Sequence, residues 1–140
     1  MSAELCQVNE PEKPRVLIAD DASGMRTYLR TILVAAGYEC FEAKDGGEAF
    51  DAILTSSFDL LITDLDMPVM DGFQLIAAVS LLPVKRGRPA IIVCSALLDE
   101  TLAIRRPELR AASVLLAKPV QPADILKAVG KVLNHRNAGG

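Results

Sequence analysis

The chain has 140 residues, of which 51% are hydrophobic and 24% are charged, and its formal net charge is −3. A chain of this length fits one domain with a sizeable core. The absence of Trp and the 4% aromatic content favour an aliphatic core over a surface that stacks on bases, and the interspersed charges argue against nucleic acid or an anionic membrane as partner.

The N-terminal residues predict a flexible leader over residues 1–14, because Pro11 and Pro14 prevent a helix or strand from propagating through its last part. The N-terminus lacks the charged start and following apolar stretch that indicate a secretory signal. No apolar run approaches the roughly 18 residues that span a bilayer. We therefore expect a cytoplasmic protein without membrane insertion.

The rest of the chain alternates between short apolar runs and segments of helical periodicity. Continuous apolar runs indicate buried strands, which we expect at residues 16–19, 38–43, 60–63, 90–94 and 114–117. Helices are expected between the strands and after the last one, except that Pro107 interrupts the fourth helix. This alternation predicts an α/β fold with a parallel sheet covered on both faces. We expect the domain to span residues 15–134, with a C-terminal tail at 135–140.

Polar residues follow four of the five predicted strands: Asp20 and Asp21 after the first, Asp64 after the third, Ser95 after the fourth and Lys118 after the fifth. In open parallel sheets, ligands bind beyond the carboxyl ends of the strands, where the strand order reverses. With the order 2-1-3-4-5, three carboxylates would meet there. Each residue alone also fits a helix cap, a turn cap or a surface charge.

Clustered carboxylates repel one another, so at neutral pH they either raise a pKa or hold a cation. Mg²⁺ prefers oxygen ligands and is often held by one or two carboxylates together with phosphate oxygens. A lysine and a serine at the same edge could stabilise charge on a transferring phosphoryl group. Asp64 could then serve as the nucleophile, and it would need no general base because it is already ionised.

The stretch from Leu61 to Gly72, with the sequence Leu-Ile-Thr-Asp-Leu-Asp-Met-Pro-Val-Met-Asp-Gly, resembles the phospho-acceptor segment of the receiver domain of two-component response regulators. The resemblance covers Arg15 to Leu133 and is to the stand-alone type, similar to chemotaxis regulators. It implies a flavodoxin-like, three-layer, doubly wound sheet of five parallel strands in the order 2-1-3-4-5.

The resemblance also implies a role for each acid. Asp64 would be the phosphorylation site. Asp21 would bind Mg²⁺ directly, Asp20 directly or through water, and the backbone carbonyl of Asp66 would complete the protein ligands.

For the remaining site residues, the resemblance implies that Lys118 pairs with the acceptor carboxylate and then with the phosphoryl group. The Lys118–Pro119 bond would be cis. Ser95 would be the switch hydroxyl, helped by the amide of Ala96. Where family members often have Tyr or Phe, this chain has Leu115, so the usual aromatic rotation is not expected.

Three alternatives remain open at this point. Asp64-Leu65-Asp66 resembles the opening motif of haloacid-dehalogenase-type phosphatases, although there the metal-binding acid pair follows the lysine. A receiver-like binding module that is never phosphorylated is the second. Flavin binding is the third, but the acidic first loop would repel the flavin phosphate.

The favoured interpretation is a signalling phospho-acceptor that catalyses only its own phosphorylation and dephosphorylation. Its expected partners are a histidine kinase or phosphotransfer protein and a downstream target protein, with no direct contact to nucleic acid. The sequence identifies neither the kinase nor the target.

Overall fold

Five parallel strands form one sheet in the order β2-β1-β3-β4-β5, as predicted. The computed structural model describes residues 12–139, with side chains to residue 134. Most of the predicted leader, residues 1–11, lies outside the described residues. The strands are β1 (Arg15–Ala19), β2 (Glu39–Ala43), β3 (Leu60–Thr63), β4 (Ala90–Ser95) and β5 (Val114–Ala117).

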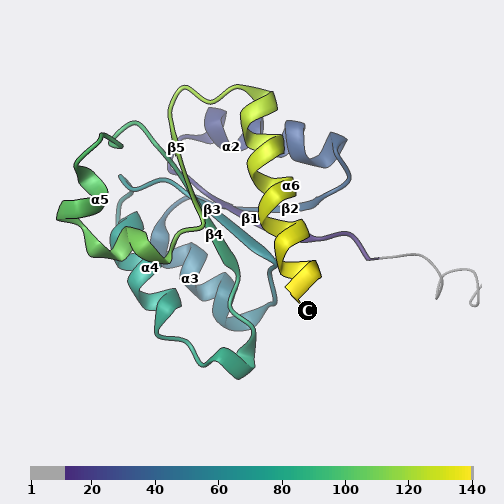
Figure 1. The fold of residues 1–140 in the computed structure, drawn as a ribbon, viewed down its shortest axis with the longest axis horizontal. Coiled ribbons are helices and arrows are strands. Elements are labelled where there is room, and N and C mark those ends of the chain that lie inside the picture. The colour runs from purple at the N-terminus through teal and green to yellow at the C-terminus, as the bar shows by residue number, and fades with distance from the viewer. Residues whose placement is uncertain (1–11, 140) are drawn as a thin grey trace, which may run out of the picture.

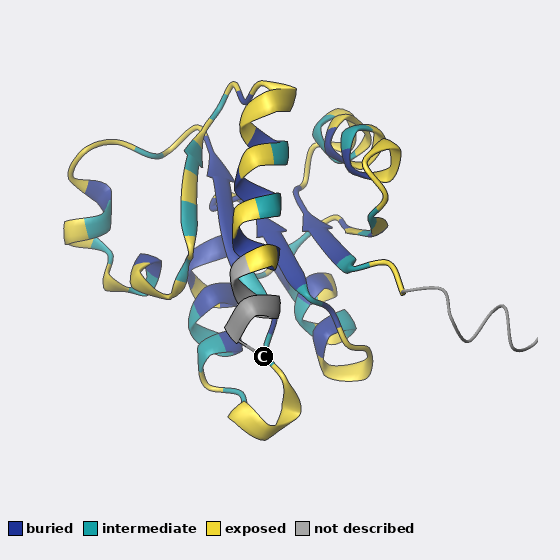
Figure 2. Cartoon of the chain, turned by 45° about the vertical axis from the view of Figure 1, so that its right-hand side comes forward, coloured by how far each residue is buried: buried dark blue, intermediate teal, exposed yellow. Residues whose placement is uncertain are grey.

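The central strands are buried because helices cover both faces of the sheet. β3 is buried at all four positions and β4 at five of six, which fits their continuous apolar sequences. β5 lies at the edge and alternates between half-buried and exposed residues, as the teal and yellow strand in Figure 2 shows. One face of β5 is therefore only partly covered.

Two helical layers enclose the sheet (Figure 1). Helices α2 (Ser23–Ala35) and α6 (Pro122–Gly139) cover one face, and α3 (Gly46–Thr55) and α4 (Gly72–Ser80) cover the other. Successive strand residues point to opposite faces. Leu61 accordingly belongs to the core under α3 and α4, whereas Ile62 belongs to the core under α2 and α6.

Side chains define where α3 and α4 begin. Asp45 accepts a hydrogen bond from the Glu48 amide at 2.7 Å and so caps α3. Asp71 and Gln74 form a reciprocal capping box at the start of α4. Because α4 starts only eight residues after Asp64, this box fixes the end of the turn that follows β3.

The fourth helix is short, as its proline predicts. α5 (Leu102–Arg105) ends before Pro107, and a 3₁₀ helix, η2 (Pro107–Ala111), replaces the rest. The Arg106 guanidinium lies over the Phe73 ring at 3.5 Å from its centroid and holds this segment against α4. Another 3₁₀ helix, η1 (Val84–Arg86), precedes β4.

The last helix is longer than expected. α6 continues to Gly139, past residue 134 at which the domain was predicted to end, because no proline interrupts that stretch. The division of the chain into leader, domain and tail otherwise stays a prediction. Within residues 12–139, none of the helices has the length and apolar character that a membrane span requires.

Candidate functional site

The sheet register brings the first and third strand ends together. Ala19 of β1 pairs with Thr63 of β3, so the residues that follow them, Asp20 and Asp64, emerge side by side. The Asp64 amide donates to the Ala19 carbonyl at 3.0 Å. One carboxylate oxygen from each of Asp20, Asp21 and Asp64 lies within 4.8 Å of the others. Asp20 and Asp64 are buried and Asp21 is exposed, so the cluster has one side open to solvent.

Lys118 lies between the two buried carboxylates. Its Nζ donates to Asp20 Oδ2 at 2.8 Å and to Asp64 Oδ2 at 3.0 Å. Burial works to lower the pKa of Lys118, but the hydrogen bonds to Asp20 and Asp64 and their negative charges outweigh burial, so the pKa is raised. The lysine is therefore charged at neutral pH. A single ammonium facing three carboxylates leaves the cluster with a net negative charge.

Asp64 is oriented through both carboxylate oxygens. Oδ1 accepts from the Leu65 amide at 2.7 Å and more weakly from the Asp66 amide at 3.4 Å, while Oδ2 faces Lys118. The α4 backbone packs directly on this residue: a Cβ added at Gly72 would lie 2.6 Å from Leu65 Cα and closer still to the Asp64 carbonyl oxygen. Only glycine allows α4 to approach so closely.

The acid pair does not cap the helix that follows it. The N-cap of α2 is Ala22, which has no side-chain cap, and Asp20 Oδ1 instead accepts from the Ala22 amide at 2.9 Å within the loop. Arg26 Nη1 donates to the Asp20 backbone carbonyl at 2.7 Å. Asp20 therefore uses Oδ1 in the loop and Oδ2 for Lys118, while one oxygen of Asp21 lies within 4.8 Å of those of Asp20 and Asp64.

The remaining predicted residues lie at or near the ends of β3, β4 and β5. Ser95 is buried at the end of β4, and its Oγ accepts from the Leu97 amide at 3.1 Å. Ala96 and Asp66 are exposed. Leu115 lies on β5 opposite Val93 and is 39% exposed.

The backbone at Lys118 has the predicted cis bond and one contact that was not predicted. The Lys118–Pro119 peptide bond is cis. The Lys118 amide donates to the Ser95 carbonyl at 3.1 Å, which ties the ends of β4 and β5 together beside the cluster.

Sequence reasoning missed two residues of α2 that support the site. Arg26 contacts the Asp20 backbone and also donates to Glu42 at 3.0 Å. The Tyr28 hydroxyl donates to the Val120 carbonyl at 2.7 Å, just after Lys118. The Tyr28 contact has no local sequence signal, since it joins residues 92 positions apart.

A doubly wound parallel sheet with clustered carboxylates and a lysine beyond its strand ends is the architecture of an α/β domain that binds its ligand at a topological switch point. The chain belongs to the response regulator receiver domain family, whose model matches residues 16–130. It is therefore a signalling domain of the two-component systems.

Named relatives cover nearly the same length. The chain is 34% identical over 121 residues to the chemotaxis protein CheY of Bacillus subtilis, a match that covers 86% of this chain and 98% of that protein. Its structure is similar to that of the chemotaxis response regulator CheY4 of Vibrio cholerae, with a TM-score of 0.76, 33% identity, and coverage of 87% of this chain and 100% of that one. It also resembles the response regulator TrrA of Thermotoga maritima, solved in complex with Mg²⁺-BeF, with a TM-score of 0.75, 26% identity, and coverage of 86% and 99%.

Proposed function

We propose that this domain accepts a phosphoryl group on Asp64 from a histidine kinase or histidine phosphotransfer protein, in a Mg²⁺-dependent reaction, and signals by contact with a downstream protein. The observation that carries the proposal is the position of Lys118 Nζ, within hydrogen-bond distance of both Asp20 and Asp64 at the edge of a three-carboxylate cluster. A capping or purely structural role for these residues would not require all four at one point.

Asp64 is the nucleophile in this reaction. One of its carboxylate oxygens forms a bond to phosphorus, and the phosphorus–nitrogen bond of a phosphohistidine donor breaks with its electron pair passing to the imidazole nitrogen. The result is an aspartyl phosphate. The amide of Leu65, which donates to Asp64 Oδ1, and the ammonium of Lys118 hold the carboxylate in place before attack.

Lys118 and Ser95 stabilise charge on the transferring group. Lys118 is already charged and lies beside the Asp64 carboxylate, so it can bind a phosphoryl oxygen as negative charge redistributes. Ser95 Oγ and the amide of Ala96 supply the further donors that the family resemblance implies. Ser95 Oγ accepts from the Leu97 amide in this structure, which leaves its own proton available to donate.

The donor set fits a hard divalent cation. Three carboxylates lie within 4.8 Å, one of them is exposed, and a single ammonium does not neutralise them. Asp20, Asp21 and Asp64 would hold Mg²⁺ with the backbone carbonyl of Asp66. When bound, the ion would offset the repulsion between the carboxylates and a negatively charged phosphodonor. The Mg²⁺-BeF complex of the related TrrA supports this choice of cation.

The test is direct phosphorylation with a small phosphodonor such as acetyl phosphate and Mg²⁺, followed by intact-mass detection of an acid-stable, alkali-labile adduct. We expect the adduct on the wild type, its loss in Asp64→Asn and its loss when EDTA removes the cation. Asp51→Asn is the matched control, because Asp51 is an exposed aspartate of α3 away from the cluster. An unlabelled wild type, or undiminished labelling of Asp64→Asn, would overturn the proposal.

The same experiment separates the alternatives. A binding module that is never phosphorylated would show no adduct under any condition. A haloacid-dehalogenase-type phosphatase would instead turn over unrelated phosphate esters at a steady rate. Residence in the cytoplasm and the identity of the partners stay predictions.

A further inference from the structure

Tyr28 of α2 reaches across to the segment that follows Lys118. Its hydroxyl donates to the Val120 carbonyl at 2.7 Å, and this bond joins α2 to the connection between β5 and α6. Tyr28 is 37% exposed, whereas Val120 is buried in the core between α2 and α6. The hydroxyl thus holds a backbone carbonyl two residues beyond the lysine.

The connection has few backbone donors with which to bond its neighbours. β5 ends at Ala117 and α6 begins at Pro122, so Lys118 lies in neither element. Two of the residues between Lys118 and Asp124 are prolines, Pro119 and Pro122, which have no N–H. On the upstream side, the Lys118 amide bonds to the Ser95 carbonyl at 3.1 Å. Tyr28 supplies the constraint on the downstream side.

The same helix also fixes the partner of the lysine. Arg26, two residues before Tyr28, donates to the Asp20 backbone carbonyl at 2.7 Å. α2 therefore holds the backbone at Asp20 and, through Tyr28, the backbone beside Lys118. Between these two anchors lies the 2.8 Å contact from Lys118 Nζ to Asp20 Oδ2.

We propose that Tyr28 is a positioning residue for phosphoryl transfer: its hydrogen bond to Val120 sets where Lys118 Nζ lies relative to Asp20 and Asp64. This inference rests on the proposed function, since it assigns a role within that reaction. Lys118 acts on charge that develops during transfer, so misplacing it lowers the rate of the chemical step. The maximal rate constant, measured at saturating donor and Mg²⁺, reports this loss.

The test compares Tyr28→Phe with Tyr38→Phe, which removes a hydroxyl from the other tyrosine of the chain. Tyr38 directly precedes β2, the strand at the far edge of the sheet, and within residues 12–134 its hydroxyl takes part in no hydrogen bond. We expect Tyr28→Phe to lower the maximal phosphorylation rate constant by roughly three- to tenfold, the equivalent of one hydrogen bond. Tyr38→Phe should match the wild type. Equal maximal rate constants for Tyr28→Phe and wild type would overturn the inference.

A double-mutant cycle separates positioning from a general structural effect. If Tyr28 acts through Lys118, Tyr28→Phe should have no further effect on the rate in a Lys118→Ala background. If the two losses multiply, Tyr28 acts independently of the lysine and the inference fails. An unlabelled wild type would instead refute the proposed function itself, so the two failures are distinguishable.

Discussion

Replacing Gly72 by alanine tests whether the start of α4 really packs on the backbone of the acceptor. The added Cβ would lie 2.6 Å from Leu65 Cα and 2.9 Å from the Asp64 carbonyl carbon, whereas ordinary contacts begin at 3.4 Å. Neither neighbour is a side chain that could rotate away. The N-terminus of α4 would have to move by a substantial fraction of an ångström, against a capping box and a buried helical face.

Overpacking of this kind costs about 3 kcal/mol when the backbone itself must shift. With a urea slope of roughly 1.5–2 kcal/mol per M for a domain of this size, the unfolding midpoint of Gly72→Ala should fall by about 1.5–2 M. Unfolding is best followed by far-UV circular dichroism, because the chain has no Trp. Displacement of the Asp64 backbone should also slow phosphorylation.

The matched control is Gly130→Ala. Gly130 lies inside α6, and a Cβ there would meet no atom within 4 Å. Alanine is the better helix former, so this variant should gain about 0.5–1 kcal/mol. The two glycine substitutions should therefore move the midpoint in opposite directions. A midpoint for Gly72→Ala equal to that of the wild type would refute the close packing of α4 on Asp64.

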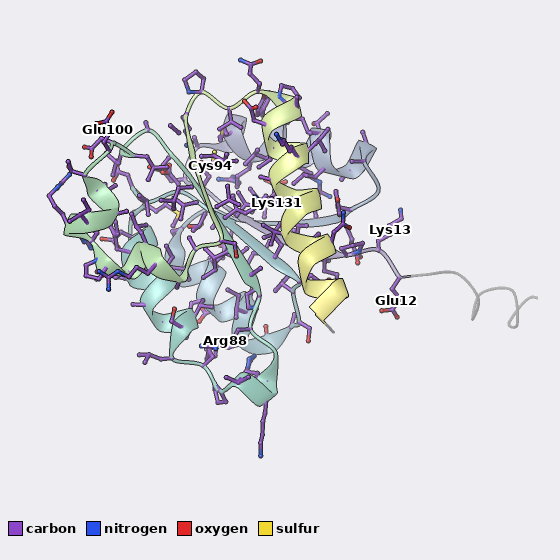
Figure 3. All side chains as sticks on the ribbon, in the orientation of Figure 1. Glu12, Lys13, Arg88, Cys94, Glu100 and Lys131 are labelled. Atoms are coloured by element: carbon purple, nitrogen blue, oxygen red, sulfur yellow. The ribbon has the colours of Figure 1, made fainter. Side chains whose placement is uncertain are left out.

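Three further substitutions test other contacts by the same unfolding assay. Burial raises the pKa of the Cys94 thiol, labelled in Figure 3, from 9.0 to about 11. The contribution of the neutral thiol to the free energy of unfolding is therefore intact below pH 9 and is lost as the pH rises toward 11. The stability advantage of wild type over Cys94→Ala should shrink by about 2 kcal/mol across that window, and a constant difference would contradict this. Asp45→Ala should lose about 1 kcal/mol with the cap of α3, while Asp51→Ala on the same helix stays within about 0.5 kcal/mol of wild type. Arg106→Ala should lose about 1 kcal/mol with its contact to Phe73, and Arg106→Lys should recover only part of that loss, because the planar stacking is absent. An Arg106→Lys variant as stable as the wild type would count against the stacking.

Local sequence signals predicted several elements of the fold well. The runs at 60–63 and 114–117 match β3 and β5 residue for residue. Pro107 predicted the break in the fourth helix, because proline lacks the N–H that a helix requires. The length of α6 was missed, since the polar residues after Leu133 carry no apolar periodicity.

The acidic and basic side chains at the strand ends were predictable because parallel strands bring their carboxyl ends to one edge. The structure brings together Asp20, Asp21, Asp64 and Lys118. Asp66 and Ser95 meet these residues through their backbones, since the Asp66 amide donates to Asp64 Oδ1 at 3.4 Å and the Ser95 carbonyl accepts from the Lys118 amide at 3.1 Å. Their roles stay predictions.

The contacts of Tyr28 and Arg106 could not be predicted from the sequence. Tyr28 bonds to a residue 92 positions away, and such a partner depends on how α2 lies against the connection after β5. Arg106 lies over Phe73 only because Pro107 ends α5 and redirects the chain. Side-chain contacts between distant elements follow from packing, which local periodicity does not encode.

The sheet divides the interior into two separate apolar cores, and this determines which substitutions influence one another. Leu61 and Ile62 are neighbours in the chain but pack in different cores, whereas Leu61 and Phe73 share one. Energetic coupling should therefore follow the faces of the sheet rather than the order of the chain, with near-additive effects across it and non-additive effects within a face. Packing residues under α2 and α6 should therefore tolerate change independently of those under α3 and α4.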